Sequence, residues 1–179
     1  MDWFQRITGF AEGTYEQVQR QLQVEGEYLV SSVNGSRHAI GRFETPTLAQ
    51  LRQRVGAQAL SGPRCRVRSI VGDARQLHAD PALREATFQV ASQFNALEMT
   101  GPQVRPEDGV TRYQFDPTQG PACAIAAGAA TIWRNYFLPL GDATGQTAQR
   151  QLDTLAGLGQ ALAARLGQLP SFCEIAIPA

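Results

Sequence analysis

The sequence contains no lysine: all 16 of its basic residues are arginines, and they are matched by 16 acidic residues. The lack of lysine excludes enzymes that form a Schiff base on a lysine side chain and phosphate-binding loops that depend on one. Because the charges balance, the chain also lacks the positive field that non-specific nucleic-acid binders use. We therefore expect no nucleic-acid partner.

Cysteine and histidine are scarce. The chain has three cysteines and two histidines: Cys65, Cys123, Cys173, His38 and His78. An odd number of cysteines without paired spacing does not indicate a disulfide framework, and these residues do not complete a common zinc-binding pattern. We expect no metal and no cofactor.

Long apolar runs are also missing. The longest nearly apolar stretch, residues 122–133, is shorter than the ~20 residues of a membrane-spanning helix, and residues 1–6 lack the order of a signal peptide. We expect a cytoplasmic monomer with no membrane partner. With 179 residues, 43% of them hydrophobic, the chain is long enough to bury one core, so we expect a single domain over residues 1–179.

Hydrophobic periodicity and turn residues predict helices that alternate with strands. The expected helices are two short ones within residues 2–22, one that Thr47 opens, a short one after Asp80, and longer ones at 120–136 and 147–166. The expected strands are 27–33 and 37–43, joined as a hairpin at Asn34-Gly35, then 65–71, 87–91 and 172–177, with a shorter candidate at 110–113. This alternation predicts an α/β fold with a mixed central sheet.

The segment 116–128 carries the most information about function. A turn with glycine and proline leads into a helix of small residues, which would leave the amides of Ala122, Cys123 and Ala124 open to an anion such as a diphosphate. The alternative is a tightly packed core helix whose alanines only allow close contact with the sheet. Spacing alone leaves both interpretations open.

Two polar residues follow predicted strands, where α/β sheets bind ligands. Asp73 could accept a hydrogen bond from an exocyclic amine such as that of adenine, or it could cap a turn. Asn95 could hold ribose hydroxyls, or it could form an Asx turn.

Four carboxylates are concentrated in and around the irregular segment 101–118 and are candidates for acid or base catalysis: Glu98, Glu107, Asp108 and Asp116. Surface loops can be acidic without a catalytic role. A cysteine nucleophile at Cys123, with His38 or His78 as its base, is a further alternative, although a cysteine among alanines is commonly a small core residue.

Taken together, three segments resemble the macrodomains, which bind ADP-ribose: Gly72-Asp73-Ala74, residues 90–98 and residues 119–125. The longer strings 87–98 and 113–137 are similar to a MavL-like bacterial branch of macrodomains that is distantly related to poly(ADP-ribose) glycohydrolases. The likeness extends more loosely from residue 2 to about residue 153. It implies a three-layer fold in which helices flank the mixed central sheet.

The resemblance implies a hydrolase that removes ADP-ribose from a mono-ADP-ribosylated protein by cleavage at the anomeric carbon of the distal ribose. The alternative is a non-catalytic module that binds ADP-ribose. The expected partner is ADP-ribose or an ADP-ribosylated protein. The Gly-Gly-Gly loop and paired glutamates of poly(ADP-ribose) glycohydrolases are absent from the sequence, so we do not expect cleavage of the polymer.

The resemblance also implies roles for single residues. Asp73 would bind adenine and Asn95 the distal ribose. The diphosphate would lie on the start of the helix, at Gln119, Gly120, Pro121, Ala122, Cys123 and Ala124. Acidic residues beside the distal ribose support catalysis in related hydrolases, and the matching positions are Asp108 and Asp116, with Glu107 as a near neighbour.

Overall fold

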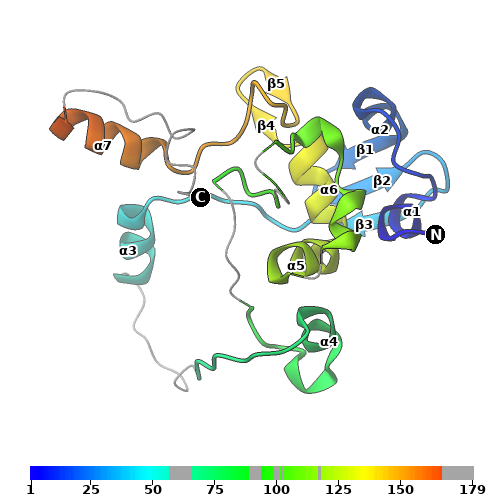
Figure 1. The fold of residues 1–179 in the computed structure, drawn as a ribbon, viewed down its shortest axis with the longest axis horizontal. Helices are drawn as coiled ribbons and strands as arrows, with labels where there is room; N and C mark the ends of the chain where they lie inside the picture. Colours follow the sequence, from blue (N-terminus) through cyan, green and yellow to red (C-terminus); the bar gives the residue numbers. More distant parts are fainter. Residues whose placement is uncertain (57–65, 89–93, 99–100, 102, 117, 167–179) are drawn as a thin grey trace.

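The computed structural model describes residues 1–56, 66–88, 94–98, 101, 103–116 and 118–166, and Figure 1 draws the others as a grey trace. The described part is a mixture of helices and two small antiparallel sheets. The α/β expectation is therefore met at this coarse level.

Two short helices open the chain, as the sequence predicts. They are α1 (Trp3–Thr8) and α2 (Tyr15–Gln21). The Asp2 carboxylate caps α1 by accepting the Gln5 amide at 2.7 Å, and Thr14 and Gln17 form a capping box at the start of α2. These caps satisfy helix-end amides that would otherwise lack a partner.

A three-stranded antiparallel sheet follows, in the order β1 (Leu22–Glu25), β2 (Tyr28–Ser31) and β3 (Arg37–Ala39). The hairpin between β2 and β3 confirms the prediction, although both strands are shorter than expected. The pairing of β1 with β2 was not predicted, because Leu22 continues the helical spacing of α2. Gly26, with a φ of +60°, allows the chain to turn so that Leu22 pairs with Ser31.

The expected helix 120–136 is two helices, α5 (Gln119–Ala127) and α6 (Ala129–Tyr136). The break lies at Gly128, which has a φ of +52°, and a Cβ there would lie 2.9 Å from Ile7 Cδ1 of α1. A two-stranded sheet, β4 (Pro139–Leu140) and β5 (Ala143–Thr144), follows α6.

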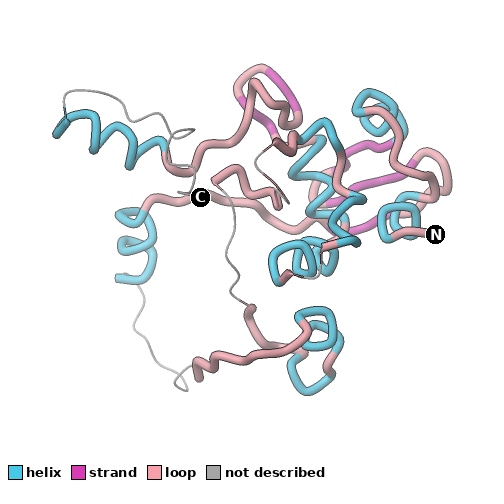
Figure 2. Tube along the Cα trace, in the orientation of Figure 1, coloured by secondary structure: helices cyan, strands magenta, loops and turns pink. Residues whose placement is uncertain are grey.

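One hydrophobic core joins these elements. Residues of α1, α2, the first sheet, α5, α6 and the segment 110–113 share it, and Figure 2 shows these elements gathered together. Burying each large apolar side chain contributes about 1.5–3 kcal/mol. The buried members are Trp3, Phe4, Val18, Leu22, Leu29, Val110, Tyr113, Ala124, Ala129, Ile132 and Tyr136.

The mixed central sheet does not occur within the described residues. Residues 66–71 and 87–88 form no strand there, and the side chains of Val67, Ile70 and Val71 are 92%, 52% and 104% exposed. The candidate strand 110–113 is wrong: Val110 is the N-cap of the 3-10 helix η3 (Thr111–Phe115), which contains residues 111–113 and follows the shorter 3-10 helix η2 (Pro106–Asp108). The remaining parts of the predicted strands, residue 65, residues 89–91 and residues 172–177, lie outside the described residues.

The Glu12 side chain explains why residues 110–113 do not form a strand. Its carboxylate accepts the amides of Val110 and Thr111 at 2.8 and 2.7 Å and the hydroxyl of Tyr136 at 2.7 Å. Two successive amides that point to one carboxylate cannot alternate their direction as the amides of a strand do.

The remaining helices are α3 (Leu48–Gly56), α4 (Ala74–Ala79) and α7 (Ala156–Leu166), with η1 (Pro81–Leu83) after α4. In Figure 1, α3 and α7 extend away from the core. The predicted cap of α3 is confirmed, since Thr47 Oγ1 accepts the Gln50 amide at 3.2 Å. The predicted helix 147–166 forms only from Ala156 onward, because residues 147–150 make a tight turn instead. Across the part of the chain that the structure describes, none of the helices has both the length and the apolar character needed to cross a membrane.

Candidate functional site

A pocket of about 270 Å³ lies where residues 96–98 meet α5 and α6. Two of the sequence segments that resemble macrodomains, 90–98 and 119–125, therefore contribute to the same pocket. Its lining residues are Phe43, Ala96, Leu97, Glu98, Gly120, Cys123, Ala124, Ala127, Thr131 and Arg134.

Glu98 supplies the only carboxylate in this lining. The carboxylate lies against the first turn of α5, so that a Cβ on Gly120 would be 2.6 Å from Glu98 Cδ. The Tyr113 hydroxyl fixes the backbone at this point by accepting the Glu98 amide at 3.2 Å. Burial raises the pKa of Glu98, and the negative charge of Asp116 raises it further, whereas the positive charge of Arg134 lowers it.

Arg134 is held in place through two nitrogens of its guanidinium. Its Nε donates to the Ala96 carbonyl at 3.0 Å and its Nη2 to Thr131 Oγ1 at 2.9 Å. Thr131 is fixed in turn, because its hydroxyl donates to the Ala124 carbonyl at 2.6 Å. Ala96 has a φ of +58°, a left-handed conformation that is uncommon for a residue with a side chain, and the bond from Arg134 stabilises it.

Arg134 has no carboxylate partner among the described residues: none of the ion pairs found there includes it. Burial lowers the pKa of its guanidinium, while the negative charge of Glu98 raises it. Within the described chain, Nη1 donates to no acceptor. A partly buried cation without an ion-pair partner costs free energy, and such groups mark candidate binding sites.

The start of α5 corrects one expectation from the sequence. The Ala122 amide donates to the Thr118 carbonyl at 3.2 Å, and the amides of Cys123 and Ala124 lie within the helical i to i−4 pattern. These three amides are therefore not open to an anion, and Pro121 has no amide hydrogen. Among the six residues expected to hold the diphosphate, Gly120, Cys123 and Ala124 line the pocket, whereas Gln119, Pro121 and Ala122 do not.

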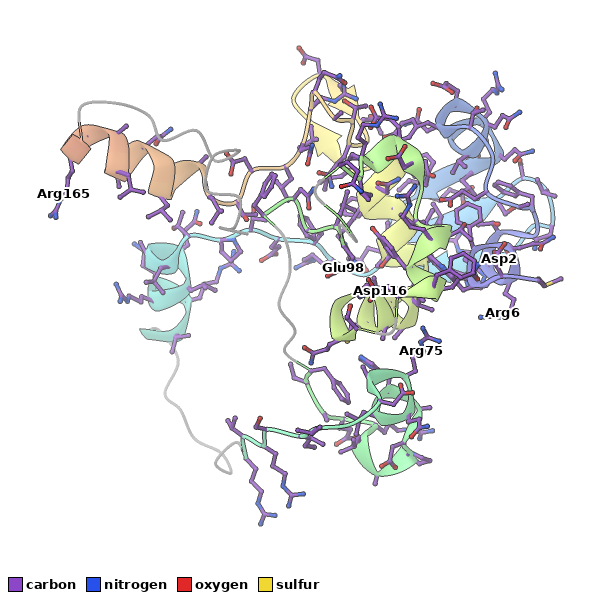
Figure 3. All side chains as sticks on the ribbon, in the orientation of Figure 1. Asp2, Arg6, Arg75, Glu98, Asp116 and Arg165 are labelled. Atoms are coloured by element: carbon purple, nitrogen blue, oxygen red, sulfur yellow. The ribbon has the colours of Figure 1, made fainter. Side chains whose placement is uncertain are left out.

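The three expected catalytic carboxylates are engaged in hydrogen bonds within the protein, and none lines the pocket. Asp116 accepts the amide of Thr118 at 2.8 Å and also its hydroxyl, and these bonds lower the pKa of Asp116. Figure 3 shows Asp116 near Glu98 beside α5, which agrees with its effect on the pKa of Glu98.

The other two carboxylates lie away from the pocket lining. Asp108 accepts the amide and the Nη2 of Arg105 at 2.9 and 3.2 Å, and these bonds lower the pKa of Asp108. Glu107 accepts the Ala148 amide at 3.0 Å with both oxygens. The structure thus brings Asp116 close enough to affect Glu98, whereas Asp108 stabilises its own turn and Glu107 links η2 to the turn 147–150.

The expected adenine and ribose ligands have structural roles. Asp73 caps α4 by accepting the amides of Arg75 and Gln76 at 2.8 and 3.4 Å. The fully buried Asn95 accepts the Leu97 amide at 3.0 Å and donates to Gln151 Oε1 at 2.8 Å. Both match the capping and Asx-turn alternatives that the sequence left open, and neither residue lines the pocket.

The cysteine-nucleophile alternative is not supported by the environment of Cys123. Burial raises the pKa of its thiol, and the charge of Glu98 adds to this effect, whereas a nucleophilic cysteine needs a lowered pKa. Neither histidine lines the pocket: His38 lies in β3, and the His78 ring packs on Phe88 with centroids 4.2 Å apart. Within the described residues, no group of three or more His, Cys, Asp or Glu side chains could hold a metal ion.

From the sequence, Glu98 was one of four candidate catalytic carboxylates, and Arg134 was not predicted to have a role. A signal for Arg134 was present, because it is the only charged residue in the segment 119–136. A lone charge on an otherwise uncharged pair of helices has to reach water, a partner or a ligand.

No protein-family model, no curated protein and no solved structure matches this chain, so its function has to be inferred from its own residues and their geometry.

Proposed function

We propose that this pocket binds the distal ribose and adjoining phosphate of ADP-ribose, and that the chain removes ADP-ribose from a mono-ADP-ribosylated protein. The reaction cleaves the bond at the anomeric carbon of the distal ribose. We also propose the fold that the sequence resemblance implies, a three-layer macrodomain with a mixed central sheet flanked by helices.

One observation carries the proposal: a carboxyl group with a raised pKa and a cation without a carboxylate partner line the same pocket. These groups are Glu98 and Arg134. The guanidinium suits a phosphate, since Arg binds phosphate oxygens through charged hydrogen bonds. The pocket is close to the lower end of ligand-binding pockets, which span roughly 300–1,000 Å³. It therefore suits a sugar and one phosphate, and the adenosine end would lie outside it.

The chemistry assigned to Glu98 is acid catalysis. In its protonated form the carboxyl donates a proton to the leaving oxygen as the bond to the anomeric carbon breaks, and water then adds to the oxocarbenium-like carbon and returns a proton to Glu98. A raised pKa increases the protonated fraction near neutral pH. Asp116, at the edge of the pocket, remains the predicted second carboxylate, whose negative charge would stabilise the positive centre.

A binding module without catalysis is the second candidate. It is favoured by the engagement of Asp108 and Asp116 in local hydrogen bonds and by the fact that neither residue lines the pocket. The two candidates predict the same binding and differ only in turnover.

Two measurements on the same variants test the proposal. ADP-ribose should raise the melting temperature of the wild type more than adenosine does, and Arg134→Gln should lose most of this shift. Arg6→Gln is the matched control, because Arg6 is exposed on α1 and distant from the pocket lining. The absence of any shift in the wild type would refute both candidates.

Release of ADP-ribose from a mono-ADP-ribosylated protein then separates the hydrolase from the binding module. The hydrolase should lose about 100-fold or more of its turnover in Glu98→Gln while it still binds ADP-ribose. A wild type that binds ADP-ribose and releases none from the modified protein would establish the binding module.

A further inference from the structure

Glu98 and the expected anionic ligand compete for the same small space. The Glu98 carboxylate lies against Gly120 at the start of α5, and both residues line the pocket of about 270 Å³ together with Arg134. A phosphate that reaches Arg134 from this pocket must therefore come close to the Glu98 carboxylate.

Charges from several elements act on Glu98. Arg134 of α6 is the nearby cation, and Asp116, in the turn before α5, is the nearby anion. Two neutral titratable groups complete the surroundings: the Tyr113 hydroxyl of η3, which accepts the Glu98 amide, and the Cys123 thiol of α5. A bound phosphate would add a second negative charge, and like charges at close range favour the protonated form of a carboxyl group.

We propose that Glu98 is a proton-linked gate of this pocket, so that an anionic ligand binds beside Arg134 together with one proton on the Glu98 carboxyl. This inference rests on the proposed function for its natural ligand, ADP-ribose. It goes beyond that function because it makes binding itself dependent on pH and names Glu98 as the residue that discriminates between anionic and neutral ligands.

Proton linkage has a defined consequence for affinity. Above the pKa of Glu98 in the free protein, the affinity for an anion should fall by up to about tenfold for each pH unit, because one proton must be taken up for each ligand bound. A neutral ligand of the same pocket, such as ribose, should show no such dependence. Glutamine at position 98 has the size of a protonated glutamate and carries no charge, so it should allow an anion to bind at every pH.

The test is calorimetric titration of the wild type, Glu98→Gln and Asp116→Asn with ADP-ribose between pH 5 and 8, since the diphosphate diester keeps its charge over this range. Wild-type affinity should fall as pH rises, and titrations in two buffers of different ionisation enthalpy should show uptake of about one proton. Glu98→Gln should bind at every pH about as tightly as the wild type does at pH 5. Asp116→Asn, the matched control, should keep the dependence but shift it to lower pH, because Asp116 raises the pKa of Glu98.

Thermal unfolding with sulfate, a simple anion of constant charge, separates the gate from the proposed function. Binding of ADP-ribose with the same pH dependence in Glu98→Gln as in the wild type would overturn the gate and leave the proposed function intact. Stabilisation by sulfate that depends on pH in the wild type alone, without binding of ADP-ribose, would support the gate and overturn the proposed function. If neither anion binds at any pH, both are overturned.

Discussion

The side chain of Glu98 lies directly over the Cα of Gly120, so that the distance from Glu98 Cδ to a Cβ on Gly120 would be 2.6 Å. Glycine at position 120 thus gives the carboxylate the room it occupies at the start of α5. The same contact places the carboxylate within the lining that Arg134 shares. A glycine from one segment and a glutamate from another together define the acidic side of the pocket.

Replacement of Gly120 by alanine tests this contact. Because the neighbour is the flexible end of a glutamate side chain, we expect Gly120→Ala to fold normally, with its free energy of unfolding within about 1 kcal/mol of the wild type. The new methyl group should displace the Glu98 carboxyl and lower turnover at least tenfold. Gly157→Ala on α7, where a Cβ would meet no atom within 4 Å, should leave turnover unchanged. Equal turnover in Gly120→Ala and the wild type would show that the position of Glu98 is unimportant.

Glu98→Gln should stabilise the protein at neutral pH. The pKa of Glu98 is raised in the folded protein, mainly by burial, so its ionised form is less favourable there than in the unfolded chain. The native carboxyl therefore adds stability below its unfolded pKa and loses that contribution as pH rises through its folded pKa. Glutamine cannot ionise, so it avoids this loss of stability at neutral pH. The expected gain in the free energy of unfolding is below about 1 kcal/mol, because solvent screens a half-buried group.

Urea unfolding at pH 7.5 and at pH 4 measures the effect of Glu98→Gln. The variant should be more stable than the wild type at pH 7.5, and the difference should shrink at pH 4. A variant that is less stable than the wild type at pH 7.5 would contradict the assigned environment of Glu98.

Cys123 should react slowly with alkylating reagents. Burial and the negative charge of Glu98 raise the pKa of its thiol, so the reactive thiolate is a smaller fraction at pH 7.5 than in an unfolded peptide. In a Cys65→Ser, Cys173→Ser background, the alkylation rate should be severalfold below that of a cysteine peptide. Adding Glu98→Gln should increase the rate, and a rate that does not change would mean that Glu98 and Cys123 are not coupled.

Two glycines after α6 offer a matched pair for stability. Gly145 has a φ of +83°, and a Cβ there would lie 2.5 Å from the Tyr136 carbonyl oxygen, whereas Gly141 has a φ of +61° with no atom within 4 Å. Gly145→Ala should cost about 3 kcal/mol or more, because a left-handed conformation and a backbone clash add together, and Gly141→Ala should cost about 1 kcal/mol. Urea unfolding checks both, and equal losses would contradict the close packing at Gly145.

Local sequence signals identified the elements that depend on local contacts. Thr47 was the predicted cap, and it satisfies an amide three residues further along; the turn at Asn34-Gly35 was also predicted, and it places β2 against β3. The two predicted short helices within residues 2–22 likewise begin at local caps, Asp2 and Thr14, which were not predicted. Such structures follow from nearby residues, so periodicity and turn chemistry predict them. The predictions fail where a residue distant in the sequence makes a contact. The predicted helix 120–136 is broken at Gly128, beside Ile7, and the predicted strand 110–113 does not form where Glu12 accepts the amides.

The candidate site shows the same difference between what local sequence predicts and what distant contacts decide. The sequence by itself determined which charged side chains this protein has. Arginine is its only strongly basic residue, the segment 119–136 contains one charged residue, and carboxylates lie around residues 98–116. Only the tertiary structure decided which of them meet, because Glu98 and Arg134 are 36 positions apart and approach through the packing of residues 96–98 on α5 and α6. Asp108 and Glu107 look equivalent to Glu98 in the sequence but bind other donors. Asp108 accepts the amide of Arg105 within its own turn, whereas Glu107 accepts the amide of Ala148, which is 41 positions away and which only the tertiary structure brings close.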